Sequence, residues 1–183
     1  MSFVDVDNEQ GSRSAVEHLI AGGRRRIATI TGPLDMGAAI DRLTGYSQAL
    51  AAGGIAADPH LQAAGGFSQP GGAEAMRHIL DVRPDIDAVF AASDLMASGA
   101  MQVLRAAGRR IPDDVAIVGF DDSPIAESTD PPLSSVRQPI EEMGREMVRL
   151  LLELTTDPGS VPRKVTLATE LVARRSSEGV ARR

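Results

Sequence analysis

The chain has 183 residues, enough for one full domain or one and a half, and long enough to bury a core without stabilising disulfides or metal ions. It contains no cysteine, which excludes disulfide scaffolds, thiolate metal sites and thiol nucleophiles. The formal net charge of −6 argues against a chain that binds nucleic acid through its own surface field.

Helical and strand patterns alternate along the chain as far as Asp121, separated by short glycine and proline links. Apolar residues at helical spacing predict helices over 11–20, 40–52, 73–80 and 95–107. Short apolar runs predict strands over 27–31, 61–64 and 88–92, and another strand that starts at Val115. This alternation predicts an α/β fold, a doubly wound parallel sheet of about five or six strands with helices on both faces.

The pattern changes after Asp121. Prolines at 131, 132 and 139 bracket a short extended segment over 133–138. A long helix follows, with apolar residues at spacings of three and four: Ile140, Met143, Met147, Leu150, Leu151 and Leu154. Loose alternation over 164–173 predicts one final strand, and we expect the charged tail over 174–183 to fray.

Motifs that would indicate catalysis or a cofactor are incomplete. The glycine pairs near residues 65 and 71 do not have the dinucleotide-binding spacing, and the only lysine, Lys164, lies in no phosphate-binding loop. The three histidines lie far apart without acids at metal-ligand spacing, and Ser93 lacks the nucleophile-elbow pattern. We therefore expect a protein that is not an enzyme, with no cofactor and no metal.

Membrane and export signals are also missing from the sequence. No apolar stretch approaches the ~20 residues of a membrane span. The segment over 1–5 carries an acid where a signal peptide has basic residues. We expect a cytoplasmic chain with no membrane partner.

Polar and aromatic residues follow the successive predicted strands. In open α/β sheets, ligands bind in the crevice beyond the carboxyl ends of the strands. An arginine, an aromatic ring, a hydroxyl, a carboxylate and an amide together suit a polyhydroxylated ligand, because they offer paired donors and acceptors and a flat apolar face. The predicted ligand-binding residues are Arg42, Phe67, Ser93, Asp121 and Gln138.

Each of these residues also has an ordinary structural interpretation. Arg42 suits a solvated helix position, Phe67 a core filler under its loop, and Gln138 a residue placed only by the following proline. Ser93 and Asp94 suit a helix cap with an acid in the first turn, and Asp122 suits a simple turn. The candidates favour a site mainly because they stand together at successive strand ends.

Motifs along residues 5–176 resemble the effector-binding part of the LacI/GalR transcriptional regulators. They are Asp7-Asn8 with Gly11, Ala15 and His18-Leu-Ile20, Arg42-x-x-Gly45-Tyr46, Gly66-Phe-Ser68, Ala91-Ala-Ser-Asp94 with Met96-Ala97, Ile111-Pro-Asp-Asp-Val115, Val118-Gly-Phe-Asp-Asp122, Pro131-Pro-Leu133, Val136-Arg-Gln-Pro139 and Thr169-Glu-Leu-Val172. The resemblance implies a periplasmic-binding-protein-like fold of type I, with a cleft between two similar subdomains. It also implies that the five candidate residues fall where that family places sugar or nucleobase contacts.

The chain differs from the family pattern at its N-terminal side. Family members begin with a helix-turn-helix headpiece and several strands of a first subdomain, which this sequence does not contain. The resemblance therefore implies a C-terminal effector-binding subdomain over 5–136, an excursion over 137–163 that belongs to the missing first subdomain, a final strand over 164–176 and a frayed tail over 177–183. It also implies that half of the ligand cleft is missing.

The expected function is therefore the binding of a small-molecule effector, a sugar or another small polar ligand such as a purine, in a LacI-type regulator that controls operator binding allosterically. A sugar is the expected effector. Operator DNA is a partner only through the absent headpiece. A periplasmic-type sugar-binding protein of a transporter is the alternative, and an enzyme with an unrecognised site is a third interpretation.

A homodimer is the assembly that the resemblance implies, with contacts near the helix over 95–107 and the loop over 123–130. The apolar stripe on that helix suits either a dimer contact or the core face: Met96, Ala97, Ala100, Met101 and Leu104. The stripe on the helix over 140–155 is too apolar to remain in water. The helix could fold back on its own subdomain, pair with its copy in a second chain or swap between protomers, and pairing is the outcome that we expect.

Overall fold

The structure is a computed structural model that describes residues 2–156 and 161–178. Its helices are α1 (Asn8–Ala21), α2 (Gly37–Ala52), α3 (Gln69–Val82), α4 (Asp94–Ala106), α5 (Pro124–Ser128) and α6 (Ile140–Thr156), with a 3-10 turn at Pro59–Leu61. Its strands are β1 (Phe3–Val6), β2 (Ile27–Thr31), β3 (Gln62–Ala64), β4 (Ala88–Ala91), β5 (Ala116–Asp121), β6 (Ser134–Arg137), β7 (Lys164–Leu167) and β8 (Glu170–Val172).

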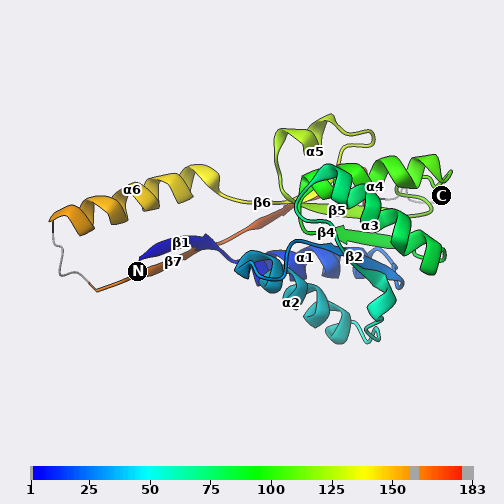
Figure 1. Cartoon of the computed structure of the whole chain (residues 1–183), viewed down its shortest axis with the longest axis horizontal. Coiled ribbons are helices and arrows are strands. Elements are labelled where there is room, and N and C mark those ends of the chain that lie inside the picture. Colours follow the sequence, from blue (N-terminus) through cyan, green and yellow to red (C-terminus); the bar gives the residue numbers. More distant parts are fainter. Residues whose placement is uncertain (1, 157–160, 179–183) are drawn as a thin grey trace.

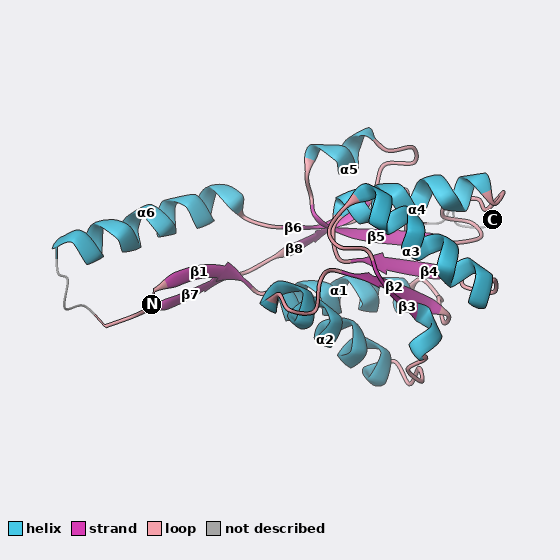
Figure 2. Cartoon of the chain, viewed as in Figure 1, coloured by secondary structure: helices cyan, strands magenta, loops and turns pink. Residues whose placement is uncertain are grey.

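The main sheet has six strands in the order β3-β2-β4-β5-β6-β8. Its first five strands are parallel, and only the edge strand β8 runs antiparallel to its neighbour. Helices α1 and α2 pack on one face and α3 and α4 on the other (Figure 2). The prediction of a doubly wound parallel α/β sheet is confirmed.

Apolar residues fill the central strands because both faces of the sheet are covered by helices. In β4, Ala88 and Phe90 contribute to the core under α1 and α2, whereas Val89 and Ala91 contribute to the core under α3 and α4. Glycines let the paired helices approach closely. A Cβ atom added at Gly99 of α4 would collide with the backbone of α3, and one at Gly45 of α2 would collide with α1.

A second, smaller sheet lies apart from the main one. Strands β1 and β7 pair in parallel, from Phe3 with Lys164 to Val6 with Leu167. Helix α6 lies against β1, and the two-stranded sheet and α6 extend together away from the main sheet (Figure 1). Three short connections join the two parts: Val6 to α1, β6 to α6, and β7 to β8.

The predicted final strand over 164–173 is wrong as a single element. It is two strands in two different sheets, because the chain crosses from β7 to β8 between Leu167 and Glu170. The extended segment predicted over 133–138 is β6, an interior strand of the main sheet. Strand β1 and the short helix α5 do not follow from the sequence pattern.

The expectation of a fraying tail is wrong for residues 174–178. Ser176 is fully buried, its backbone N–H donates to the carbonyl of Pro132, and its hydroxyl donates to the carbonyl of Ile117. Arg174 is paired with Asp122. The remainder of the predicted tail, 179–183, lies outside the described residues.

The stripe on α4 is core and not a dimer surface. Its five members are at most 1 % exposed and pack beneath the sheet: Met96, Ala97, Ala100, Met101 and Leu104. The interpretation of these side chains as a dimer contact is therefore wrong. Within the described residues, no helix is long and apolar enough to cross a bilayer.

Candidate functional site

The candidate site lies where the strand order of the main sheet reverses. From β2 the chain moves outward to β3, and it then returns to β4 on the other side of β2. The loops that leave neighbouring β2 and β4 therefore diverge to opposite faces and leave a crevice at their carboxyl ends. Four of the five predicted site residues meet at this edge, namely Arg42, Phe67, Asp121 and Gln138.

Arg42 is the centre of the site. It projects from the inner face of α2 and is only 5 % exposed. Its Nη1 donates to the carbonyl of Ala92 at the end of β4 at 2.6 Å and lies 3.5 Å from the Asp121 carboxylate. Its guanidinium stacks on Phe120, 3.6 Å from the ring centroid. The alternative interpretation of Arg42 as a solvated helix residue is wrong.

Burial lowers the pKa of Arg42, and the carboxylate of Asp121 offsets part of that shift. An arginine remains charged under all ordinary conditions, so the site presents a fixed positive group in a mostly dry setting. Burial of such a group requires partners for its enclosed donors, and here Nη1 donates to the carbonyl of Ala92 and lies beside the Asp121 carboxylate.

Phe67 stands beside Arg42 in the loop that follows β3. Its ring centroid lies 5.8 Å from the Arg42 guanidinium carbon, and its backbone has a positive φ of 52°. The ring covers Gly32, where any Cβ atom would collide with it. Phe67 is half-buried and also packs against the core, so it fills space under its loop and still presents part of its ring at the site.

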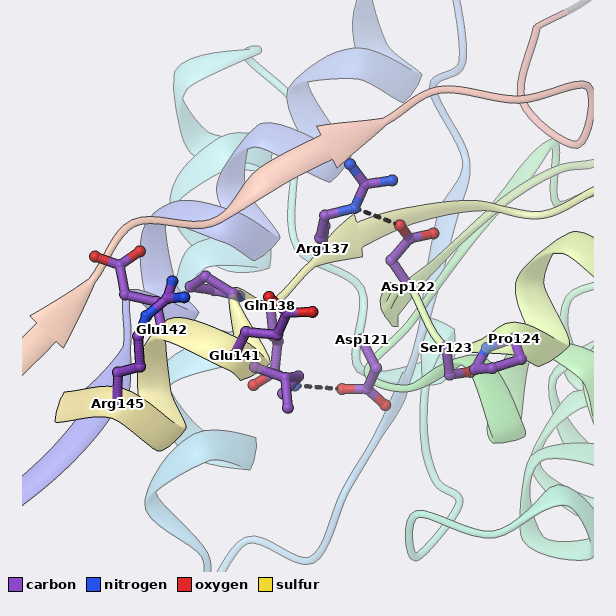
Figure 3. Close-up of a pocket in the computed structure, with 11 residues that line it drawn as sticks. Asp121, Asp122, Ser123, Pro124, Arg137, Gln138, Glu141, Glu142 and Arg145 are labelled. Atoms are coloured by element: carbon purple, nitrogen blue, oxygen red, sulfur yellow. Dashed lines mark hydrogen bonds and ion pairs between the residues drawn. The ribbon is translucent and has the colours of Figure 1, made fainter. Parts of the chain in front are cut away.

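Asp121 and Gln138 meet at the ends of β5 and β6. The Gln138 side-chain amide donates to Asp121 Oδ1 at 2.6 Å (Figure 3). Burial raises the pKa of Asp121, and the neighbouring Arg42 opposes this shift. Gln138 is therefore engaged directly with another candidate residue and is not merely placed by the following proline.

A pocket of about 690 Å³ opens beside this pair, at the start of α6. Asp121, Asp122 and Gln138 line it from the main sheet, and Glu141 and Arg145 line it from α6 (Figure 3). Arg42, Phe67 and Ser93 do not line it. The pocket therefore extends the site from Asp121 and Gln138 toward the start of α6.

Ser93 is placed differently from the other candidates. It is 4 % exposed, and its hydroxyl oxygen accepts the backbone N–H of Met96 at 3.3 Å, which caps α4. This contact matches the interpretation of Ser93 as a helix N-cap residue. Ser93 nevertheless lies directly beside Ala92, the residue that Arg42 contacts, at the same edge of the sheet.

The sequence favours a simple first-turn acid at Asp94, but this side chain is fully buried. Oδ2 accepts from the backbone N–H and the hydroxyl of Ser123 at 2.7 and 3.0 Å, and Oδ1 accepts from the Ser135 hydroxyl at 2.5 Å. The Ser135 hydroxyl oxygen in turn accepts the backbone N–H of Asp122 at 3.0 Å. Asp94 therefore fastens the turn that carries Asp121, although burial raises its own pKa to about 6.

Asp122 is held by two arginines and is not a simple turn residue. Its side chain is 5 % exposed and lies 2.7 Å from Arg137 and 2.7 Å from Arg174. Asp121 and Asp122 both have positive φ values, 112° and 51°, which L-residues rarely adopt. The ion pairs and the Asp94 contacts hold this strained turn in one arrangement.

Sequence reasoning missed Asn8 as a site residue. It is 2 % exposed, and its side-chain oxygen accepts from Arg42 Nε at 2.8 Å. In the sequence it stands out only as part of a motif, because nothing in the local pattern shows that the start of α1 lies against α2. Among the described residues, no cluster of three or more potential ligands is placed to hold a metal ion.

Comparisons with known proteins identify the family of the chain. Residues 16–177 match the family model of a periplasmic binding protein-like domain. The chain is similar to the HTH-type transcriptional regulator CelR of Thermobifida fusca, with 53 % identity over 176 residues, which cover 96 % of this chain and 52 % of that protein. It is also similar to the HTH-type transcriptional repressor CytR of Escherichia coli K12, with 41 % identity over 150 residues, covering 82 % of this chain and 44 % of CytR.

Solved structures show the same relationship. The structure of a transcriptional regulator CelR–cellobiose complex superposes with a TM-score of 0.94 at 53 % identity, covering 96 % of this chain and 54 % of that one. The chain thus spans about half the length of the curated relatives it matches.

Proposed function

Because this chain belongs to the periplasmic binding protein-like domain family, we propose that it forms the effector-binding part of a LacI-type transcriptional regulator that senses a sugar. The observation that carries the proposal is the ion pair of the buried Arg42 with the half-buried Asp121, beside the ring of Phe67 at the carboxyl edge of a parallel sheet. The relatives it matches are transcriptional regulators, which favours this function over a transport protein or an enzyme.

A sugar suits the groups that the site presents. Adjacent hydroxyls of a sugar both donate and accept, so one face can contact a guanidinium while another contacts a carboxylate. Arg42 supplies donors, Asp121 and Gln138 supply an acceptor and an amide, and Phe67 supplies an apolar face for C–H groups. The similar CelR structure is a complex with cellobiose, which makes cellobiose the first effector to test here.

The division of the chain into subdomains is also a proposal. In it, residues 5–136 and 164–176 belong to the second subdomain of the regulator, and 137–163 belong to the first. Two observations support an excursion: α6 lies apart from the main sheet, and most of its apolar side chains are exposed. Strands β1 (Phe3–Val6) and β7 (Lys164–Leu167) lie in the outlying sheet. This supports assigning the residues just after position 5 and just after position 164 to the first subdomain as well.

The mechanism that follows is a shift between two arrangements of the subdomains. A ligand that contacts both sides of the cleft stabilises the closed arrangement, and the change in angle alters the spacing of DNA-binding headpieces. In this proposal the regulator is a cytoplasmic homodimer, and operator DNA binds only through the headpiece, which lies outside this chain. The domain itself is not catalytic.

Calorimetry tests the proposed function directly. A regulator that carries this chain together with a first subdomain is titrated with cellobiose and with a panel of other mono- and disaccharides. Saturable binding of one sugar is the expected result. Absence of binding to every sugar in the panel would contradict the proposal.

A further inference from the structure

Asn8 occupies a position between the two sheets. It is the first residue of α1, separated from the outlying strand β1 only by Asp7, and it is almost completely buried. Its side-chain nitrogen donates to the carbonyl of Val6 at 3.2 Å and to Asp5 Oδ1 at 3.1 Å. Its side-chain oxygen accepts from Arg42 Nε at 2.8 Å.

The orientation of this amide follows from its partners. Arginine has only donors, so the amide oxygen must face Arg42, and the carbonyl and carboxylate oxygens on the other side require the amide nitrogen. The amide nitrogen of Asn8 is thus directed at strand β1, and its amide oxygen at Arg42 of helix α2. A different polar residue of similar size cannot satisfy both sides in this way.

The contact with Asn8 determines how the guanidinium of Arg42 lies. Nε is fixed by Asn8 and Nη1 by the carbonyl of Ala92, which holds the guanidinium plane over Phe120. Within residues 2–156 and 161–178, Nη2 makes no hydrogen bond. The two fixed nitrogens therefore determine where the remaining donors point.

The contacts on the other side lead to the outlying sheet. Asp5 and Val6 belong to β1, which pairs with β7 and lies against α6. A displacement of β1 relative to the main sheet would carry the Asn8 amide with it and would turn or release Arg42.

We propose that Asn8 is a positioning residue, which holds the guanidinium of Arg42 in its ligand-binding orientation and fastens it to strand β1 of the outlying sheet. The role of Asn8 in ligand binding rests on the proposed function, whereas the mechanical link does not. Asn8 touches no ligand itself in this proposal, and it makes the orientation of Arg42 depend on where β1 lies.

The test compares three variants of the 183-residue chain. Asn8→Ala removes all three contacts. Asn8→Asp keeps an acceptor for Arg42 Nε but loses the donors to β1 and places a second carboxylate beside Asp5. Asp7→Ala is the matched control, because Asp7 caps the same helix by accepting the backbone N–H of Gln10 and does not contact Arg42.

The primary readout is the rate at which the Arg42 Nε proton exchanges with solvent, measured by nitrogen-resolved NMR without any ligand. We expect exchange at least tenfold faster in Asn8→Ala, restored protection in Asn8→Asp, and no change in Asp7→Ala. Unchanged exchange in Asn8→Ala, or an equal effect in Asp7→Ala, would overturn the proposal.

The second readout is amide exchange along β1, over Phe3–Val6. Asn8→Asp should raise it at least tenfold above the level in Asp7→Ala while Arg42 stays protected. If Asn8→Ala does not fold, this comparison decides the matter alone, and equal exchange in the two variants overturns the proposal.

Cellobiose titration of a regulator with both subdomains measures the effect of the same variants on ligand affinity. Asn8→Ala should weaken binding at least tenfold, and Asn8→Asp should recover part of the loss. If the unaltered regulator binds no sugar, the proposed function fails, and the two exchange measurements still decide whether Asn8 links Arg42 to β1.

Discussion

At the scale of single residues, the site is built from groups that are costly to bury and that stabilise one another. Arg42, Asp94 and Asp122 are each almost fully enclosed, and each has two or more partners of opposite charge or complementary polarity. Removing one member of such a set leaves its partners buried without compensation. The effects of substitution should therefore be large and unequal.

Substitution of Arg42 by alanine should abolish effector binding. Loss of a buried bidentate donor leaves ligand hydroxyls and Asp121 unpaired, at a cost of ~2–5 kcal/mol in binding free energy. Asp121→Asn should cost less, because the amide oxygen still accepts. Calorimetry with the sugar that binds best is the measurement.

Arg13→Ala is a suitable control for this measurement. Arg13 has a partly exposed side chain on α1 and pairs with its helix neighbour Glu17. It should leave affinity unchanged. An Arg42→Ala variant that binds as tightly as the unaltered protein would remove Arg42 from the site.

Asp94 should make stability depend on pH. Its folded pKa is raised to about 6 from an ordinary value of 3.8, mainly because burial disfavours the charged form. The folded state therefore holds the proton more tightly than the unfolded state. The contribution of this group to stability is fully present below pH 3.8, falls as pH rises, and is lost above about pH 6.

The size of this effect is at most about 3 kcal/mol, because each unit of pKa difference corresponds to about 1.4 kcal/mol. Urea unfolding between pH 4 and pH 7 measures it, with Asp94→Asn as the comparison that lacks the titrating group. The difference in unfolding free energy between the two proteins should change over this range. A constant difference would show that Asp94 does not titrate there.

At the scale of elements, the parts of the chain that are predictable are those buried on both faces. Strands β2 and β4 are short runs of apolar residues, with two threonines in β2, and their predicted and observed bounds differ by at most one residue. Helices α2 and α3 begin three and four residues earlier in the structure than the sequence predicts. Their first turns contain glycine or proline and little apolar surface, so the apolar pattern starts only after them.

The elements that the sequence pattern misses are short or depend on distant partners. Strand β1 has four residues, one of which is Asp5, and no local pattern shows that it pairs with β7 more than 150 residues away. The change of sheet between Leu167 and Glu170 leaves no mark on the alternation of side chains. The prediction that Asp121 and Gln138 follow neighbouring strands placed them correctly near one another. The contacts of Asp94 with Ser123 and of Asn8 with Arg42 join residues from different elements, so the local sequence pattern does not show them.

Helix α6 should associate through its apolar stripe. Met147 and Leu151 are 53 % and 61 % exposed, and only Leu150 is buried, so the helix does not fold back on the main sheet. Burial of each such side chain is worth ~1.5–3 kcal/mol. Pairing with the same helix of a second chain lets one apolar face cover its copy.

Sedimentation of the 183-residue chain tests this expectation. The unaltered chain should sediment as a dimer, and a Met147→Glu, Leu151→Glu double variant should be monomeric. Arg145→Glu with Arg149→Glu, on the polar face of the same helix, controls for added acidic charge. If the unaltered chain and the first variant are both well-folded monomers with equal melting temperatures, this account of α6 is wrong.

At the scale of the whole molecule, the charge and the described elements predict how the chain behaves toward DNA. The net charge is −6, and the main sheet and its helices contain no helix-turn-helix unit among the described residues. We expect no sequence-specific DNA binding by this chain alone in a mobility-shift assay. Nanomolar binding to an operator at physiological salt would contradict this.

The three connections between the two sheets have a mechanical consequence. Two of them run side by side, since the backbone N–H of Asp7 donates to the carbonyl of Leu167 at 2.8 Å, and glycine-mediated helix contacts make the main body stiff. Because three connections join the two parts, we expect their easiest relative motion to be a rotation about an axis through these connections and not a sliding. Helix α6 then acts as a lever of ~25 Å, so that a turn of about 10° would move its far end by roughly 4 Å.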